Sequence, residues 1–417
     1  MSEKQNQKAI LVGIASKSSE LRECEISLDE LERLADTAGA ETCAKVVQIK
    51  DSYDPRTLIG SGKVREISEL ASNIDASLVI FDEELSPAQI RNLENDIGAG
   101  VTVIDRSMLI LDIFALHATS GEGKIQVELA QLKYTAPRLV GKGLELSRQG
   151  GGIGSRGPGE SKLETDRRHL HEKIVNLENR LRELEGNRAV MRAQRDRSGL
   201  PKIALVGYTN AGKSTLLNSL TGAGVLSEDK LFATLDPTTR KSVLPSGADY
   251  LLTDTVGFIR KLPHHLVKAF KSTLDEVRYA DILLIVSDIS DPEVSAHIAV
   301  TESVIEELGA GAKPRLYVFN KADMHSDPYS LPLGKEAVIV SARTGKGIDS
   351  LLSSIDDIIL KFKRKIKLLI PYTDQSVLSE IYNVYTVKNT EYTENGILVD
   401  TVLDDRGAGL YNKYILK

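Results

Sequence analysis

The sequence predicts an α/β protein interrupted by a long helical segment, and three observations lead to this fold class. Over residues 8–120, short apolar runs alternate with helical patterns, which is typical of a small α/β domain with a largely parallel sheet. Over residues 121–198, long helical periodicity replaces the strands. After residue 199 near-continuous apolar runs return, and such runs suit strands buried on both faces of a doubly wound, mostly parallel sheet.

The composition is that of an ordinary soluble protein with several domains. Of the 417 residues 41% are hydrophobic and 27% are charged, and the net charge is -6. The N-terminus lacks the apolar core of a signal peptide, and the longest apolar runs are too short to span a bilayer. The two cysteines, Cys24 and Cys43, indicate reducing surroundings. We therefore expect a cytoplasmic monomer with no membrane span.

The first domain, residues 1–120, is expected to alternate strands and helices. The predicted strands are 9–15, 45–49, 77–81 and 101–105, and the predicted helices are 20–38, 62–73, 87–97 and 106–119. The sequence "GSGK" at 60–63 is similar to a nucleotide-binding loop, but Val64 follows the lysine and the first glycine of the motif is missing. We therefore expect no phosphate contact there.

Residues 121–198 predict an antiparallel helical hairpin. Helices over 124–148 and 161–197 are joined at 149–160, and a capping box of Ser161 and Glu164 predicts the start of the second helix. The apolar stripes of the two helices face each other. They consist of Ile125, Leu129, Leu132, Ala136 and Leu139, and of Leu163, Leu170, Ile174, Leu177, Leu181, Leu184 and Met191.

The hairpin tip, Gly150 to Glu160, contains six glycines within residues 150–159 and spells GxGxxG at Gly152, Gly154 and Gly157. A dinucleotide site requires a strand before this motif, but the preceding residues are helical. Two interpretations stay open: a flexible linker, or a backbone probe for folded RNA.

Charge favours the RNA interpretation of the tip. Residues 121–197 carry 16 Lys and Arg against 11 Asp and Glu, in an otherwise acidic chain. The tip itself is flanked by Arg148, Arg156 and Lys162, which could meet RNA phosphates.

The third domain, residues 199–365, is expected to have five strands, and a fourth, residues 366–417, is expected to be a small α+β domain. The predicted strands are 202–207, 249–254, 281–288, 314–320 and 336–342. The last domain is predicted to hold a strand, a helix near 374–384 and two further strands, after a basic run at 361–367 that we interpret as a solvated connector.

A phosphate-binding motif follows the first strand of the third domain. The sequence "GYTNAGKS", residues 207–214, matches G-x-x-x-x-G-K-[ST] between a predicted strand and a predicted helix. Its backbone N–H groups are expected to ring the phosphates, while Lys213 reaches the β- and γ-phosphates and Ser214 binds Mg²⁺. The predicted nucleotide-binding residues here are Gly207, Tyr208, Thr209, Asn210, Ala211, Gly212, Lys213, Ser214 and Thr215.

Three further motifs follow later strands, and their order indicates a GTP site. Asp254 of "DTVG" could hold Mg²⁺ through water, and the Gly257 amide could meet the γ-phosphate. Asp323 of "NKAD" offers a double acceptor that fits guanine, and "SAR" offers a backbone amide to the guanine O6 atom. Ligands bind at the carboxyl ends of strands in such sheets. The predicted residues are Asp254, Thr255, Val256, Gly257, Asn320, Lys321, Ala322, Asp323, Ser341, Ala342 and Arg343.

Several of these motifs resemble the HflX family of translation-linked GTPases, in the Obg–HflX group. The matching stretches are "GPGESKLETDRR", "GYTNAGKSTLLNSL", "LFATLDPTTR" and "DTVGFIRKLP". The resemblance covers almost the whole chain and implies a P-loop GTPase domain with an N-terminal domain and a helical hairpin. It also implies binding to the large ribosomal subunit and its RNA, with the tip near the peptidyl-transferase region.

The resemblance also assigns switch I. Spacing alone leaves Thr234, Thr238 and Thr239 open as the second Mg²⁺ ligand, and the resemblance selects Thr234. The implied nucleotide-binding residues of switch I are Phe232, Ala233, Thr234, Leu235 and Asp236.

Two residues bear on the chemistry of GTP hydrolysis. Phe258 stands where many GTPases have a glutamine that orients the attacking water, so unassisted hydrolysis should be slow and a partner should complete it. Asn210 resembles residues in loops that recruit K⁺ beside the phosphates, and a role in shaping the loop stays equally open. The groups expected to act in catalysis are Lys213, Thr234, Gly257 and Asn210.

The sequence thus predicts a GTP hydrolase that binds the large ribosomal subunit and splits or rescues stalled ribosomes. Mg²⁺ is the expected cofactor, with K⁺ as a second candidate. Two alternatives stay open: an RNA-binding factor in assembly of the large subunit, and a nucleotide-switched module that binds proteins without RNA.

Overall fold

The structure is a computed structural model that describes residues 7–147, 158–197, 199–222, 224, 230–263, 266, 270–324, 337–362, 364–403 and 405–416. The chain forms two compact units. The first unit consists of Met1–Glu185, Glu228–Asp236 and Val256–Leu274, and the second consists of Gly186–Ser227, Pro237–Thr255 and Asp275–Lys417. Most of the predicted hairpin tip, with Arg156, and the flanking Arg148 lie outside the described residues.

The N-terminal part of the first unit is a four-stranded parallel sheet with the order β2-β1-β3-β4. Its strands are β1 (Gln7–Ala15), β2 (Ala40–Ile49), β3 (Leu78–Phe81) and β4 (Thr102–Asp105). The helices are α1 (Leu21–Thr37), α2 (Ser61–Ile74), α3 (Pro87–Ile97) and α4 (Arg106–His117). Every strand and helix predicted for residues 8–120 is therefore present.

The apolar side chains of its strands explain why this sheet forms. The β1 run "AILVGIA" is buried throughout, because parallel strands with helices on their faces have no solvent-facing side. Ile10, Val12 and Val79 pack in one core with Ile67 and Leu93 from the covering helices. Burial of this apolar surface is the main force that holds the sheet.

A buried ionic cluster sits where β3 ends. Arg106, whose side chain is 2% exposed, donates to Asp82 Oδ1 at 2.7 Å and lies 3.2 Å from Glu30 Oε1. Ser27 Oγ donates to the other oxygen of Asp82 at 2.7 Å. Burial alone would raise the pKa of Asp82, but the charges of Arg106 and Lys261 hold it below its ordinary value.

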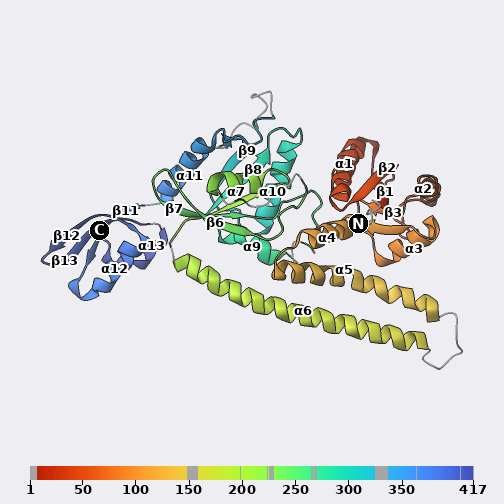
Figure 1. The fold of residues 1–417 in the computed structure, drawn as a ribbon, viewed down its shortest axis with the longest axis horizontal. Helices are drawn as coiled ribbons and strands as arrows, with labels where there is room; N and C mark the ends of the chain where they lie inside the picture. The colour runs from red at the N-terminus through yellow and green to blue at the C-terminus, as the bar shows by residue number, and fades with distance from the viewer. Residues whose placement is uncertain are drawn as a thin grey trace. The chain divides into compact units, whose positions relative to one another are not determined.

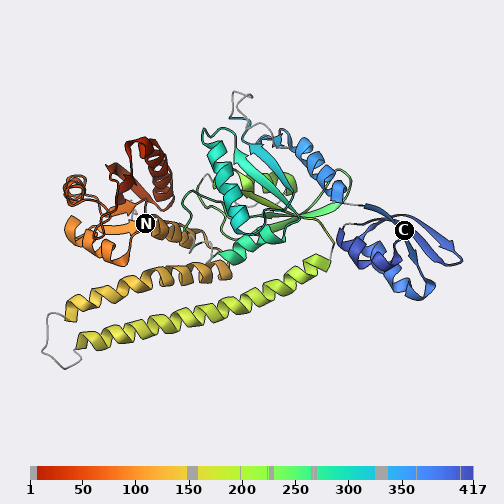
Figure 2. The same ribbon diagram turned by 180° about the vertical axis from the view of Figure 1, so that it is seen from behind.

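The hairpin consists of α5 (Gly121–Ser147) and α6 (Pro158–Arg197), which run side by side in both views (Figures 1 and 2). Ile125 and Leu129 of α5 pack against Leu177 of α6, as the apolar stripes predict. The side chains of Leu163, Lys162 and Met191 lie outside the described ones.

The predicted start of the second hairpin helix is wrong. Helix α6 begins at Pro158, so Ser161 and Glu164 lie inside the helix and do not cap it. Proline suits the first helical position because it has no N–H to leave unpaired and its φ is already helical. The predicted tip therefore loses its last three residues to α6.

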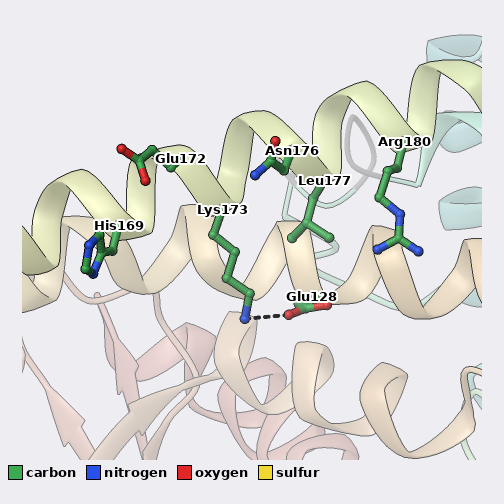
Figure 3. Close-up of a pocket in the computed structure, with 7 residues that line it drawn as sticks. All are labelled: Glu128, His169, Glu172, Lys173, Asn176, Leu177 and Arg180. Carbon is green, nitrogen blue, oxygen red and sulfur yellow. Dashed lines mark ion pairs between the residues drawn. The ribbon is translucent and has the colours of Figure 1, made fainter.

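Ion pairs across the hairpin reinforce the apolar seam. Figure 3 shows Lys173 of α6 reaching Glu128 of α5, and the two side chains are 2.7 Å apart. Lys133 and Glu178 make a second pair, also at 2.7 Å. These pairs are exposed and contribute at most about 1 kcal/mol each. Burial of the seam therefore supplies most of the stabilisation.

The second unit contains a six-stranded sheet with the order β10-β9-β8-β5-β7-β6. Its strands are β5 (Lys202–Gly207), β6 (Thr238–Val243), β7 (Asp249–Asp254), β8 (Ile282–Asp288), β9 (Arg315–Asn320) and β10 (Ala337–Ile339). Its helices are α7 (Lys213–Thr221), α9 (Lys271–Tyr279), α10 (Val294–Glu307) and α11 (Ile348–Phe362). Residues 271–274 of α9 are assigned to the first unit.

This sheet confirms the predicted doubly wound, mostly parallel architecture, with one strand that the sequence did not predict. Strand β6 pairs antiparallel with β7 at the sheet edge. Its residues "TTRKSV" are all partly or fully exposed, so the strand lacks the apolar run that identified the others. Strand β10 is also shorter than the predicted 336–342.

The C-terminal residues form a three-stranded antiparallel sheet with the order β11-β13-β12. Its elements are β11 (Arg364–Ile370), α12 (Gln375–Val384), β12 (Thr386–Thr393), β13 (Gly396–Leu403) and α13 (Asp405–Leu410). The interpretation of 361–367 as a connector is wrong for its second half, because β11 begins at Arg364. Ile366, Leu368 and Ile370 lie two residues apart and pack in the core of this domain, and this spacing was the signal for the strand.

None of the helices in the described part of the chain is long and apolar enough to cross a membrane.

Replacing Arg106 with alanine should strongly destabilise the first unit. The change leaves Asp82 and Glu30 buried with their main cationic partner removed, and breaking such a pair costs about 3–5 kcal/mol. The free energy of unfolding in urea, followed by circular dichroism, measures the effect. Arg56→Ala is the matched control, because its pair with Asp96 is exposed and should matter little. Equal stability of the two variants would contradict the prediction.

Candidate functional site

The predicted phosphate loop connects β5 to α7 and surrounds a buried lysine. Lys213 begins α7 and is 7% exposed, and its Nζ donates to the carbonyl oxygens of Gly207 at 3.2 Å and Tyr208 at 2.9 Å. Burial lowers the pKa of Lys213 to about 8, against the opposing effect of the Asp254 charge. The start of α7 therefore combines a helix N-terminus with an ammonium group, an arrangement suited to bind phosphate.

Two glycines allow the loop its path. A Cβ on Gly207, at φ +153°, would lie 2.1 Å from the Val286 carbonyl oxygen of β8. A Cβ on Gly212, at φ +86°, would lie 2.3 Å from Asn320 Nδ2. These contacts explain the first and last glycines of the motif by close approach of other groups. Asn210 also has a positive φ, of +60°, which supports its role in shaping the loop.

A hydroxyl and a carboxylate meet beside this loop. Ser214 Oγ donates to Asp254 Oδ2 at 2.6 Å, and Asp254 is fully buried at the end of β7. Both groups supply oxygen atoms, the ligand type that Mg²⁺ prefers. The donor set of these two residues thus fits the predicted magnesium ion.

Asn320, at the end of β9, connects the phosphate loop to the loop that follows β10. Its Nδ2 donates to the Ala211 carbonyl at 3.0 Å, and its Oδ1 accepts from the Ala342 amide at 2.9 Å. The side chain is 2% exposed, so both bonds are shielded from water. Sequence reasoning placed Asn320 at the site but did not predict this bridge, since it depends on how three loops meet.

The predicted base-reading carboxylate lies at the same sheet edge and is open to solvent. Asp323 Oδ1 accepts from Ser341 Oγ at 2.6 Å, and this hydrogen bond lowers the pKa of Asp323. The neighbouring Lys321 pairs with Asp288 at 2.7 Å. Asp323 is therefore ionised at neutral pH, and its hydrogen bond with Ser341 orients the carboxylate.

Residues 232–236, predicted as switch I, and residues 256–258 belong to the first unit, whereas the phosphate loop belongs to the second. Phe232 and Leu235 are buried, and Thr234 is half-buried. Phe232 packs edge-to-face on Phe114 of α4, with ring centroids 4.8 Å apart. After β7, Gly257 of the "DTVG" motif is buried, and Phe258 is completely buried.

Asp236, the last residue of the predicted switch I, caps the first helix of the hairpin. Its Oδ2 accepts from the backbone amides of Thr119 at 3.0 Å and Ser120 at 2.7 Å, directly before α5 begins at Gly121. A Cβ on Gly123 would lie 2.5 Å from Asp236 Oδ1, so glycine permits the approach. These hydrogen bonds hold the pKa of Asp236 low despite partial burial. The structure thus gives Asp236 a partner that the sequence did not predict.

Residues 260–261, which follow the "DTVG" motif, are bonded to the ionic cluster at the end of β3. Lys261 Nζ donates to Asp82 at 2.6 Å and to Glu83 at 2.7 Å, and Arg106 donates to the Arg260 carbonyl at 3.1 Å. Burial would lower the pKa of Lys261, but the two carboxylates raise it above its ordinary value. Sequence reasoning missed this connection, because no local pattern links residues 178 positions apart.

This arrangement is that of a P-loop GTPase, in which the loop surrounds a buried lysine and a serine lies beside a strand-end aspartate. Models of three protein families match the chain. They are "GTP-binding GTPase N-terminal" over residues 25–115, "GTP-binding GTPase Middle Region" over 117–195 and "50S ribosome-binding GTPase" over 202–321.

Relatives of similar length identify the family. The GTPase HflX of Caldanaerobacter subterraneus subsp. tengcongensis is 49% identical over 394 residues, covering 94% of this chain and 90% of that protein. The GTPase HflX of Escherichia coli is 43% identical over 375 residues, covering 88% and 87%. The chain belongs to the HflX family of GTPases, and it is therefore a GTP hydrolase.

A solved structure is similar over much of the chain. A GTP-binding protein from Sulfolobus solfataricus in complex with GDP is 27% identical, with coverage of 84% of this chain and 98% of that chain and a TM-score of 0.44.

Replacing Asn320 with alanine should weaken binding of both GTP and GDP by about tenfold to a hundredfold. The change removes two buried hydrogen bonds and leaves the Ala211 carbonyl and Ala342 amide without this partner. Titration with a fluorescent guanine nucleotide measures the loss. Asn320→Asp should be at least as defective, because it keeps the acceptor for Ala342 but places a buried carboxylate oxygen against the Ala211 carbonyl. Wild-type affinity in Asn320→Ala would refute the bridging role.

Proposed function

We propose that this GTPase binds the large ribosomal subunit and uses a GTP-dependent switch to split or rescue stalled ribosomes. The observation that carries the proposal is the position of Asp236, which ends switch I and caps the first helix of the hairpin. A change in switch I on GTP binding must therefore alter contacts at the base of α5. The family match to a 50S ribosome-binding GTPase supports the same partner.

In this proposal the phosphate loop and the strand ends hold Mg²⁺·GTP. Lys213 would bind the β- and γ-phosphates, and Ser214 and Thr234 would bind Mg²⁺ directly, with Asp254 acting through water. The Gly257 amide would meet the γ-phosphate. The ion would neutralise charge that develops on the phosphate oxygens during hydrolysis. The role of Asn210 in binding K⁺ stays a prediction.

The hairpin would act as the arm that carries the switch to the ribosome. Two helices packed along an apolar seam form a stiff support, and the glycine-rich segment at their ends would let a backbone approach folded RNA closely. Arg148, Arg156 and Lys162 would meet phosphates around it.

The switch segments suit a GTPase that depends on its partner. Phe258 offers no hydrogen bond to water, and it is completely buried in the first unit. Asp236 and Lys261 are both engaged by the N-terminal region. Hydrolysis would then await a ribosome that stabilises a rearranged switch, in accord with slow unassisted turnover.

Replacing Asp323 with asparagine should shift base preference from guanine to xanthine. The carboxylate accepts two hydrogen bonds from the guanine N1–H and N2–H₂ groups, and an amide cannot accept both. We expect weaker GTP binding and stronger binding of xanthosine triphosphate, measured by competition against a fluorescent nucleotide. Unchanged GTP affinity would contradict this assignment of the base site.

Replacing residues 148–157 with a four-residue turn should leave GTP affinity unchanged and abolish both ribosome-stimulated hydrolysis and subunit splitting. The substitution spares the described parts of α5 and α6, while it removes the proposed RNA probe. GTPase rates with and without ribosomes, and light scattering of intact ribosomes after addition of protein and GTP, measure the two effects.

A charge variant provides the control for this experiment. Changing Arg148, Arg156 and Lys162 to glutamine keeps the glycine backbone but should make ribosome binding weaker and less salt-sensitive. If the shortened protein splits ribosomes normally, the segment is only a linker. If the charge variant sediments with ribosomes as the wild type does, a partner without RNA is favoured.

A further inference from the structure

A histidine from helix α10 lies directly against the phosphate loop. The imidazole of His297 stacks on the ring of Tyr208, with ring centroids 3.8 Å apart and an angle of 13° between the planes. Tyr208 is 7% exposed, and the side chain of His297 is 14% exposed. The pair is thus a largely water-shielded contact between a helix and the second residue of the GYTNAGKS motif.

The backbone of His297 is bonded to both the preceding and the following turn of α10. Its backbone amide donates to the Glu293 carbonyl at 3.0 Å, and its carbonyl accepts from Thr301 Oγ1 at 2.8 Å. Nδ1 of the ring is 3.7 Å from Asp291 Oδ2, and Asp291 is fixed in turn because its Oδ1 accepts from the Glu293 amide at 2.9 Å. The imidazole therefore lies close to both the Asp291 carboxylate and the ring of Tyr208.

The residue that it contacts controls the direction of the phosphate-binding lysine. The carbonyl of Tyr208 accepts from Lys213 Nζ at 2.9 Å and from the Ala211 amide at 3.3 Å. The preceding residue, Gly207, lies so close to the β8 backbone that no Cβ fits. The start of the loop is thus in contact with both β8 and the side chain of His297.

The sequence motif itself leaves this contact unspecified. The pattern G-x-x-x-x-G-K-[ST] permits any residue in the second position, because only backbone groups of that residue face the phosphates. An aromatic ring there is not needed for phosphate binding as such. Its use in this chain is to supply a surface on which α10 can fix the loop.

We propose that His297 is a positioning residue for GTP: it stacks on Tyr208 and thereby fixes the carbonyl group that orients Lys213. The inference rests on the proposed role of Lys213 in binding the β- and γ-phosphates. His297 does not need to touch the nucleotide. A movement of α10 would be transmitted through this stack to the loop, so the helix is coupled to nucleotide affinity.

Replacing His297 with alanine tests the inference. Loss of an aromatic stack should raise the dissociation constants for GTP and GDP about two- to twelvefold. The KM for GTP should rise by the same factor while kcat stays within about twofold, because the interaction precedes the chemical step. His297→Phe keeps a ring on Tyr208 and should restore affinity to within about twofold of the wild type.

Two further variants make the result unambiguous. Ser303→Ala changes an exposed residue of the same helix and should have no effect. Lys213→Ala reports on the proposed phosphate site itself and should abolish productive binding. If Lys213→Ala binds GTP normally, the proposed site is wrong. If Lys213→Ala fails but His297→Ala matches Ser303→Ala, the positioning role alone is overturned.

The phenylalanine variant guards against an effect of misfolding. Circular dichroism and thermal unfolding establish that each variant is folded before titration. If His297→Phe is folded and binds as weakly as His297→Ala, stacking is not the cause of the affinity, and the inference fails. The double variant His297→Ala, Tyr208→Ala should be no weaker than the worse single variant, because both remove one contact.

Discussion

The parallel pairing of β5 with β7 and β8, and of β8 with β9, is the constraint on which the nucleotide site depends. Parallel strands end at the same edge of a sheet, so residues far apart in sequence are brought together there without any local signal. Gly207, Asp254, Asp288 and Asn320 each end one of these strands. The apolar strand interiors therefore determine where the polar chemistry lies.

The chain passes from one compact unit to the other directly after β7. Thr255 belongs to the second unit, and Val256 begins a segment of the first. Within the first unit the segment is held by burial of Phe258 and by the charges around Asp82 and Lys261. Removing charges from water is costly, and only close pairing offsets that cost. Close pairing with Asp82 and burial of Phe258 therefore hold this segment within the first unit.

The hairpin and the phosphate loop are stabilised by different interactions. In the hairpin, the apolar seam supplies stability, whereas exposed ion pairs such as Lys173 with Glu128 add little. In the loop, hydrogen bonds of Asn320 and Lys213 are shielded from water and so depend strongly on geometry. The first arrangement gives length and stiffness, and the second gives precise position.

The sequence by itself determined the alternation of strands and helices, the hairpin seam and the order of the nucleotide motifs, because these depend on local periodicity and spacing. It failed where neighbours in space decide: β6 has no apolar run and forms by pairing with β7, and β11 begins within a basic run. Only the tertiary structure placed Asp236 on α5, Lys261 on Asp82 and His297 on Tyr208. Each contact joins residues distant in sequence, and no local pattern records which distant group a side chain will meet.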